Sequence, residues 1–319
     1  MDHVPFKKKR GVNKIMMKNG KVNHSLQTAY IRRYTLTDGT ESGLKVIEMN
    51  NGAIRLLLNE SKGLDIMQLW HRGTNISFVS KNGFTQRELP FATRFEGGML
   101  YTCGIDSIGG REGYETHGTY HNTPSKIIQT VCNESILQVV AEIEDTCLFG
   151  RNLLIQRTIT LPIDREEVTV EDVLINRGTK EENYCLLYHV NLGYPMLDEG
   201  AEIVGDFGDI VPRTKKSQEC IKERNIFSQA KDNEEESCYF MEDYGETVSV
   251  LNRKIGKRFD LQYSKDTLPC FIQWNSPASQ DYALGLEPAT SYLDDRFAYK
   301  VIEPDEEIKF AINMSITQI

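Results

Sequence analysis

The segment from residue 136 to residue 175 decides the fold class, because apolar and polar residues alternate in three successive runs. The runs are ILQVVAEI (136–143), LLIQRTITL (153–161) and VTVEDVLI (168–175). Alternation with a period of two residues is typical of a strand with one buried and one exposed face. We therefore expect three consecutive half-buried strands.

The same alternation recurs toward the C-terminus, at residues 248–251 and 308–314. Turn-forming residues separate the apolar runs: Asn-Asn-Gly at 50–52, Pro-Ile-Asp at 162–164 and Asn-Arg-Gly at 176–178. Such residues suit hairpin turns because they tolerate the backbone angles that a tight reversal needs. The pattern indicates consecutive antiparallel pairs of strands.

Helical periodicity is weak, and its best candidates lie at residues 219–229 and around Tyr282. The most polar stretch, 231–237, is interpreted as a surface loop because the strand pattern resumes directly after it. No internal repeat of fixed period is present, which argues against a propeller or a solenoid. We predict an all-β fold, a sandwich of large and mainly antiparallel sheets, and not a doubly wound α/β fold.

The composition is that of a globular chain with enough apolar residues for a large core. The 319 residues carry a formal net charge of −9, which opposes binding to nucleic acid. We expect a single domain over residues 1–319, with residues 1–25 as a flexible or edge segment that contains the basic run 7–10.

Cysteine usage and hydropathy bear on the compartment. The seven cysteines are scattered and form no C-x-x-C pair, so we interpret them as reduced thiols of a cytoplasmic protein. The N-terminus lacks the apolar region of a signal peptide, and no run of about 18 apolar residues suggests a membrane span. We therefore expect no membrane partner.

His189 and Asn191 interrupt an otherwise apolar strand, YCLLYHVNL (184–192). Residues two apart share one face of a strand, so both side chains are expected to point into a common cavity. The alternative is a core histidine bonded to a backbone carbonyl. The catalytic interpretation requires a partner.

Glu287 is the candidate partner. It follows an apolar strand and precedes Pro288, which favours an extended backbone at this point. A desolvated carboxylate there would have a raised pKa. The alternative is an ordinary glutamate that faces water at the end of a strand.

Three further residues are candidate sugar contacts. Arg94 and Asp106 flank the glycine-rich segment RFEGGMLYTCG (94–104), whose glycines are expected to let the backbone approach a ligand. Trp274 could stack on a sugar face, although core packing is the alternative for it.

A metal site and a nucleophilic triad are the alternatives to acid–base chemistry. His117 and His121 have the i, i+4 spacing of metal ligands, but Gly118-Thr119-Tyr120 between them is a poor helix and no further ligand follows at motif spacing. No G-x-S-x-G motif is present, and the apolar surroundings of the cysteines would raise their thiol pKa values. We expect neither a metal site nor a nucleophilic triad.

Four segments of the chain resemble the aldose 1-epimerase or galactose mutarotase-like superfamily, and in particular its uncharacterised mutarotase-like branch. They are RFEGGMLYTCG (94–104), THGTYHNTPS (116–125), YHVNLGYPMLDEGA (188–201) and ALGLEPATS (283–291). The resemblance implies a single-domain β-supersandwich. It also implies an enzyme that interconverts the anomers of a free sugar without a cofactor.

The resemblance assigns roles to several residues. It implies that Glu287 is the general base, that His189 is the general acid, and that His117 holds the sugar near the ring oxygen. Arg94 stands where relatives keep a sugar-binding arginine. His121 and Trp274 match no family position and are expected only to line the pocket.

The sequence also departs from the family pattern. Thr93-Arg94 replaces an Asn-Arg pair, and His189-Val190-Asn191-Leu192 replaces a longer motif with Tyr-Phe-Asn-Leu, so we expect a reshaped pocket. The alternatives are a non-catalytic carbohydrate-binding or sugar-sensing protein, and a lyase or glycosidase accessory domain.

Two further expectations concern the substrate and the oligomeric state. Phosphorylated sugars are conceivable substrates, since the chain has the arginines to bind one phosphate: Arg72, Arg94, Arg111 and Arg296. A homodimer through exposed strand edges is the oligomeric state that such sandwiches commonly adopt.

Overall fold

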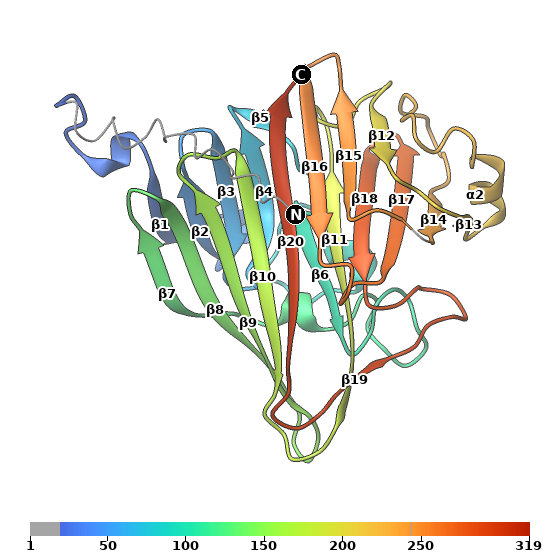
Figure 1. The fold of residues 1–319 in the computed structure, drawn as a ribbon, viewed down its shortest axis with the longest axis horizontal. Coiled ribbons are helices and arrows are strands. Elements are labelled where there is room, and N and C mark those ends of the chain that lie inside the picture. The colour runs from blue at the N-terminus through green and yellow to red at the C-terminus, as the bar shows by residue number, and fades with distance from the viewer. Residues whose placement is uncertain (1–19, 243) are drawn as a thin grey trace, which may run out of the picture.

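The computed structural model describes residues 20–242 and 244–319, and its strands form three antiparallel sheets (Figure 1). The basic run 7–10 and most of the segment 1–25, for which flexibility or an edge position was expected, lie outside the described residues. The described part of that segment leads into a short 3-10 helix, Ser25–Gln27.

The first sheet is a five-stranded meander in chain order. Its strands are β1 (Tyr30–Thr35), β2 (Lys45–Asn50), β3 (Ile54–Asn59), β4 (Asp65–His71) and β5 (Thr74–Asn75). The Asn-Asn-Gly turn at 50–52 joins β2 to β3, as its residues predict.

The second sheet has eight strands in the order β12-β15-β16-β20-β10-β9-β8-β7. Their bounds are β7 (Lys126–Cys132), β8 (Ile136–Thr146), β9 (Asn152–Pro162), β10 (Glu167–Asn176), β12 (Glu202–Gly205), β15 (Thr247–Asn252), β16 (Lys257–Tyr263) and β20 (Glu307–Gln318). All five predicted strands lie in this sheet, which confirms the reading of their alternation.

The third sheet has the order β13-β14-β17-β18-β11-β19, and β6 also pairs with β11. Its strands are β6 (Leu100–Ile105), β11 (Glu182–Leu192), β13 (Ile210–Pro212), β14 (Ser237–Met241), β17 (Cys270–Ala278), β18 (Asp281–Ala289) and β19 (Lys300–Ile302). This sheet carries both His189 and Glu287.

Helices are short, as expected for an all-β chain, but the two helix candidates were wrong. Tyr282 lies in β18, where pairing with β17 overrides the weak local periodicity. Only Glu219 of the segment 219–229 is helical, at the end of α2 (Lys215–Glu219), and turns follow it. The other α-helix, α1 (Phe91–Arg94), is a single turn.

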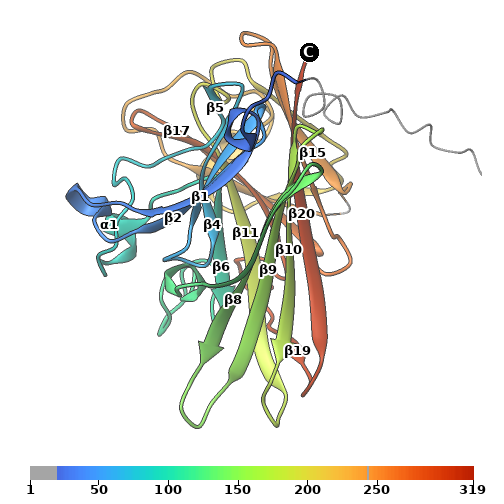
Figure 2. The ribbon, with the colours of Figure 1, turned by 90° about the vertical axis from the view of Figure 1, so that its left-hand side faces the viewer.

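The position of β11 explains why residues on both of its faces are apolar. One face, with Leu186, Tyr188 and Val190, packs into a core that also contains side chains of the first and second sheets. The other face, with Cys185 and Leu187, belongs to a second apolar cluster. In Figure 2, β8, β9, β10 and β20 form one layer, with β6 and β11 beside it.

Candidate functional site

The pairing of β11 with β18 brings His189 and Glu287 together. Val190 lies opposite Leu286, and Leu187 opposite Ala289, so His189 faces Glu287 across the two strands. Their side chains are almost completely buried, and His189 Nε2 lies 3.2 Å from Glu287 Oε1. The predicted partners are therefore a cross-strand pair, held by sheet register rather than by a loop.

This pair forms part of the wall of a cavity of about 530 Å³. The volume lies within the range of small-molecule sites. Trp274, on the neighbouring β17, also lines it, with its ring 5.6 Å from that of His189. Aromatic side chains from other segments also line it: Phe78, Phe91 and Phe95, the last with its ring 5.8 Å from that of His189.

His117 reaches the cavity from the loop after β6. Its ring centroid lies 5.6 Å from that of His189 and 5.0 Å from that of Phe91. The Gly109 backbone N–H donates to His117 Nδ1 at 3.3 Å. A neutral imidazole that accepts at Nδ1 carries its proton on Nε2, so His117 is a hydrogen-bond donor at Nε2.

Burial keeps the titratable groups of the site neutral. It lowers the pKa of His189 to about 3, helped by the adjacent His117, and that of His117 to about 4, helped by Arg213. Burial raises the pKa of Glu287 to about 8, against the opposing effect of Arg213. At pH 7 the pair therefore consists of a neutral imidazole and a protonated carboxyl group.

Gly285 provides the space in which the pair meets. A Cβ atom at this position would lie 2.6 Å from Glu287 Oε1, 2.9 Å from His189 Cε1 and 3.2 Å from the Trp274 ring. Gly285 stands opposite Trp274 on β17 and Asn191 on β11. A larger residue there would displace both members of the pair.

The other candidates lie outside the cavity lining. Arg94 forms an ion pair with Glu115 at 2.6 Å. Asp106 accepts a hydrogen bond from the Thr119 backbone at 3.0 Å, and Asn191 Nδ2 donates to the His189 carbonyl at 2.9 Å. Asp106 and Asn191 thus bind backbone groups near the site, and Arg94 binds a side chain.

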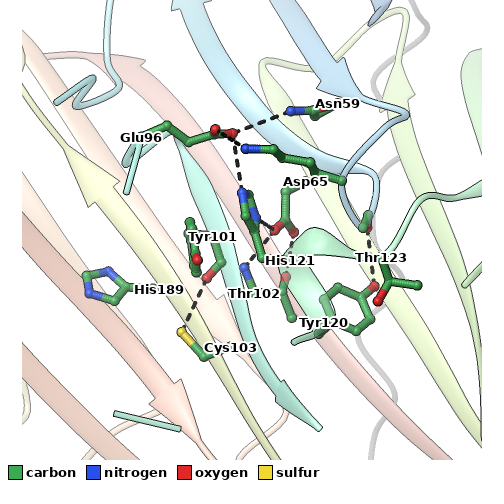
Figure 3. Close-up of polar contacts among 12 residues, drawn as sticks. Asn59, Asp65, Glu96, Tyr101, Thr102, Cys103, Tyr120, His121, Thr123 and His189 are labelled. Atoms are coloured by element: carbon green, nitrogen blue, oxygen red, sulfur yellow. Dashed lines mark hydrogen bonds and ion pairs between the residues drawn. The ribbon is translucent and has the colours of Figure 1, made fainter. Parts of the chain in front are cut away.

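His121 belongs to a buried polar network (Figure 3). Its Nδ1 lies 2.6 Å from Asp65 Oδ2 and its Nε2 3.3 Å from Glu96 Oε1. Burial opposes charge on His121, but hydrogen bonds to both carboxylates outweigh it and leave the pKa raised. His121 is thus not among the residues that line the cavity.

Arg157 completes the network at its other end. Its guanidinium contacts Asp172 at 2.9 and 2.7 Å and Asp65 at 2.6 Å, and it is fully buried. Lys62 pairs with Glu96 at 2.7 Å. Opposite charges therefore alternate along the network.

The two histidines with i, i+4 spacing have different surroundings, and the glycines of segment 94–104 pack against other parts of the protein. His117 faces the cavity and His121 the network, and residues 20–242 and 244–319 contain no group of three or more His, Cys, Asp or Glu arranged to hold a metal ion. Gly97 lies against the Phe78 ring and Gly98 against the Ile66 carbonyl. Contacts within the protein, not with the cavity, require these two glycines.

Sequence reasoning missed several lining residues. Ser276 is two residues after Trp274 on β17, so alternation along that strand could have identified it. Arg213 and Glu236 also line the cavity, at one edge of the third sheet. No local signal distinguishes these two from other charged residues of the chain.

Comparisons with known proteins bear on the family and the fold. Residues 41–315 match the family described as Domain of unknown function (DUF4432). A search of curated proteins found no match.

Several solved structures are similar. A provisionally assigned aldose 1-epimerase from Klebsiella pneumoniae is 19% identical, with a TM-score of 0.79 over 90% of this chain and 83% of that one. A galactose mutarotase-like protein from Clostridium acetobutylicum is 13% identical, with a TM-score of 0.69 over 92% and 100%. A galactose mutarotase related enzyme from Lactobacillus acidophilus is 11% identical, with a TM-score of 0.61 over 86% and 97%. The expected galactose mutarotase-like fold is confirmed.

Proposed function

The chain belongs to the DUF4432 family, and we propose that it is a mutarotase-like isomerase that interconverts the α and β anomers of a free aldose or a sugar derivative. The observation that carries this proposal is the 3.2 Å contact between His189 Nε2 and Glu287 Oε1 on the wall of the cavity. Anomer exchange requires one proton donor and one proton acceptor at the same sugar, and this pair supplies both.

In the proposed reaction, Glu287 takes the proton from the anomeric hydroxyl and His189 protonates the ring oxygen. The bond from C1 to the ring oxygen breaks and yields the free aldehyde. Rotation about the C1–C2 bond and reclosure on the other face give the other anomer, and the protons return by the reverse route. The reaction moves only protons, so the proposal needs no cofactor.

The protonation of the free site fits this scheme. A protonated Glu287 beside a neutral His189 holds the same number of protons as a carboxylate beside an imidazolium. Transfer of one proton across the contact converts the first state into the second. The pair therefore holds one transferable proton at neutral pH, as the reaction requires.

His117 and Trp274 are proposed to hold the sugar. The Nε2–H of neutral His117 can donate to a sugar oxygen next to the pair, and the ring of Trp274 offers an apolar face for the sugar C–H groups. The aromatic side chains of the lining are proposed to limit the access of water, which would protect the proton transfers.

The second candidate is a non-catalytic protein that binds or senses a carbohydrate. The neutral state of both His189 and Glu287 favours it, because neutral groups can serve as plain hydrogen-bond partners of sugar hydroxyls. We propose the same small-molecule sugar partner in either case.

Among residues 20–242 and 244–319, no helix has the length and hydropathy of a membrane span.

Anomer exchange measured by saturation-transfer NMR on free aldoses, deoxy-sugars, sulfo-sugars and hexose 6-phosphates tests the proposal. Glu287→Gln and His189→Ala are expected to slow exchange by about 10²- to 10⁴-fold. The control is Glu166→Gln, which removes a carboxylate 2.7 Å from His71 but outside the cavity lining. Sugars that bind without faster exchange would favour the second candidate.

The pH profile provides an independent test. Exchange should fall above about pH 8, when Glu287 loses its proton and the pair has none left to transfer. It should also fall in strong acid, as His189 and Glu287 both become protonated. A rate that keeps rising above pH 9 would contradict the assigned proton count.

A further inference from the structure

Arg213 lies at the edge of the sheet that forms the cavity wall. It directly follows β13, and its backbone N–H donates to the Cys238 carbonyl at 3.0 Å, which continues the pairing of β13 with β14. Cys238 pairs with Trp274, and Trp274 with Gly285. Residues opposite one another across antiparallel strands share a face, so Arg213 is in one row with Cys238, Trp274 and Gly285.

The other charged residues of the lining have partners within the protein. Lys81 pairs with Asp281 at 2.7 Å, and Glu234 pairs with Lys216. Glu236 accepts a hydrogen bond from Trp274 Nε1 at 2.7 Å. Among the described residues, Arg213 forms no ion pair, and it is the lining cation without a carboxylate partner.

The four arginines considered earlier as phosphate ligands are engaged elsewhere. Arg72 pairs with Glu166, Arg94 with Glu115, and Arg296 with Asp294. Arg111 stacks 3.9 Å from the Phe297 ring centroid. None of the four lines the cavity, so Arg213 is the arginine placed to meet a ligand.

The distance from Arg213 to the His–Glu pair suits the two ends of one sugar. Strands β13 and β18 are three strand spacings apart, about 14 Å between backbones. A long arginine side chain spans about half of that interval. A pyranose with its anomeric carbon over Glu287 and one face on Trp274 would direct its far end toward the guanidinium.

We propose that Arg213 binds an oxyanion substituent (a carboxylate, phosphate or sulfonate) on the end of the sugar remote from the anomeric carbon. The position of that end rests on the proposed function. A guanidinium is suited to this task because its planar fork donates two parallel hydrogen bonds to two oxygens of the anion. The substrate class is then an acidic or phosphorylated sugar rather than a neutral aldose.

Glu236 limits how the anion can approach. Its carboxylate lines the same edge of the cavity and would repel an oxyanion placed beside it. Its hydrogen bond from Trp274 holds it on the indole side. Replacement by Gln removes this repulsion, so Glu236→Gln should strengthen binding of an anionic sugar while Arg213→Gln weakens it.

Binding and anomer exchange are measured separately, by calorimetry and by saturation-transfer NMR. The probes are glucose, glucuronate and glucose 6-phosphate, with the corresponding galactose series, and inorganic phosphate. Within each series the ring is constant and only the group at C6 changes. The control variant is Lys81→Met/Asp281→Asn, which removes a paired cation and its carboxylate from the same wall without changing the net charge.

Anionic sugars should bind the wild type more tightly than the neutral sugar of the same series. Arg213→Gln should weaken the binding of anionic sugars by about 10- to 100-fold and reduce the salt dependence of that binding. The binding of neutral sugars should not change. The control should keep the preference. Equal losses for neutral and anionic sugars would overturn the proposal, and so would binding of inorganic phosphate as tight as that of glucose 6-phosphate.

The two proposals can fail separately. Arg213-dependent binding of anionic sugars without any faster exchange supports the anion site and removes the isomerase function. Fast exchange with no preference for anionic sugars retains the isomerase and overturns the anion site. If no sugar of either series binds, both proposals are wrong.

Discussion

Two buried histidine–carboxylate contacts lie side by side in this molecule, and burial has opposite outcomes in them. His189 meets Glu287 in the cavity wall, whereas His121 meets Asp65 and Glu96 in the buried network. Tyr101 separates them: it stands opposite His189 in the pairing of β6 with β11, and it stacks on His121 with ring centroids 3.7 Å apart. Figure 3 shows Tyr101 between His189 and His121, with the contacts of His121 to Asp65 and Glu96.

The difference lies in the number of compensating partners. Burial opposes charge in both places, but His121 has two carboxylates, and these in turn have Arg157 and Lys62. The pKa of His121 is raised, and hydrogen bonds and cations hold the pKa values of Asp65 and Glu96 down despite burial. His189 and Glu287 have little beyond each other and stay neutral. A buried contact is therefore ionic only where its surroundings offset desolvation, and a neutral pair keeps a mobile proton.

The largest expected effect comes from breaking the network at Arg157. Arg157→Met leaves Asp172 and Asp65 buried without their guanidinium partner, and should lower the free energy of unfolding by about 4 to 5 kcal/mol at pH 7. Urea unfolding measures it. Arg165→Met, which removes an exposed ion pair with Glu167, is the control and should change little. A small loss for Arg157→Met would mean that the network is not ionic.

Glu287→Gln should act in the opposite direction. Below pH 4.5 the carboxyl group is protonated in both folded and unfolded states. Between pH 4.5 and about 8 only the unfolded state ionises, so the wild type loses stability that the glutamine variant keeps. The variant should be about 4 to 5 kcal/mol more stable at pH 9 and equal at pH 4.

Glu166→Gln is the contrasting control for that experiment. Burial raises the pKa of Glu166, but the hydrogen bonds that it accepts from Arg72 and His71 outweigh burial and leave the pKa lowered. Its stabilising contribution is therefore present above pH 4.5 and is lost in acid. Its glutamine variant should therefore be less stable than the wild type at pH 7. Equal behaviour of the two variants would show that Glu287 is ionised in the folded protein.

His121→Gln should cost about 2 kcal/mol in acid and less in base. The raised pKa of His121 means that its contribution is fully present below pH 6.5 and is lost as the pH rises through the folded-state value. Unfolding at pH 5.5 and pH 9 measures the difference. His24→Gln, at an exposed helix cap, is the matched control. A cost that does not change with pH would argue for a neutral His121.

Gly285→Ala is expected to have the smallest effect on stability, about 1 to 2 kcal/mol, because the added methyl group must displace the pair. Anomer exchange should fall by about 10- to 100-fold. Labelled His189 should show a shifted ¹³Cε1 resonance, a readout that does not depend on activity.

Gly110→Ala is the control for Gly285→Ala, since Gly110 also lines the cavity but has open space where a Cβ atom would lie. It should leave the resonance and the exchange unchanged. No shift in Gly285→Ala would remove Gly285 from a positioning role.

The fold was largely predictable because alternation reports burial directly. The runs that became β8, β9 and β10 each have one face in the core, and each shows the pattern. The helix prediction at Tyr282 failed because pairing with a neighbouring strand determines the backbone conformation more strongly than a weak local periodicity does. The single-domain organisation and the homodimer stay predictions.

The candidate site was predictable only in part. His189 could be identified because a polar side chain in a strand that is buried on both faces requires a polar partner or a cavity. His121 shows the limit of that argument, because its sequence surroundings resemble those of His117. Only the tertiary structure shows that His117 faces the cavity and that His121 faces two carboxylates. Arg213 could not be found, because its position depends on which strands are neighbours.

The two faces of β11 also bear on how this protein can diversify. Tyr188 donates to Asp172 inside the core, and the next residue, His189, faces the cavity. His189 is thus anchored in a strand buried on both faces, while Arg213 stands at a strand edge and His117 in a loop. Single substitutions at Arg213 or His117 should therefore alter ligand binding without moving His189 or Glu287. The proposed ligand preference and the proposed acid–base chemistry therefore depend on different parts of the fold.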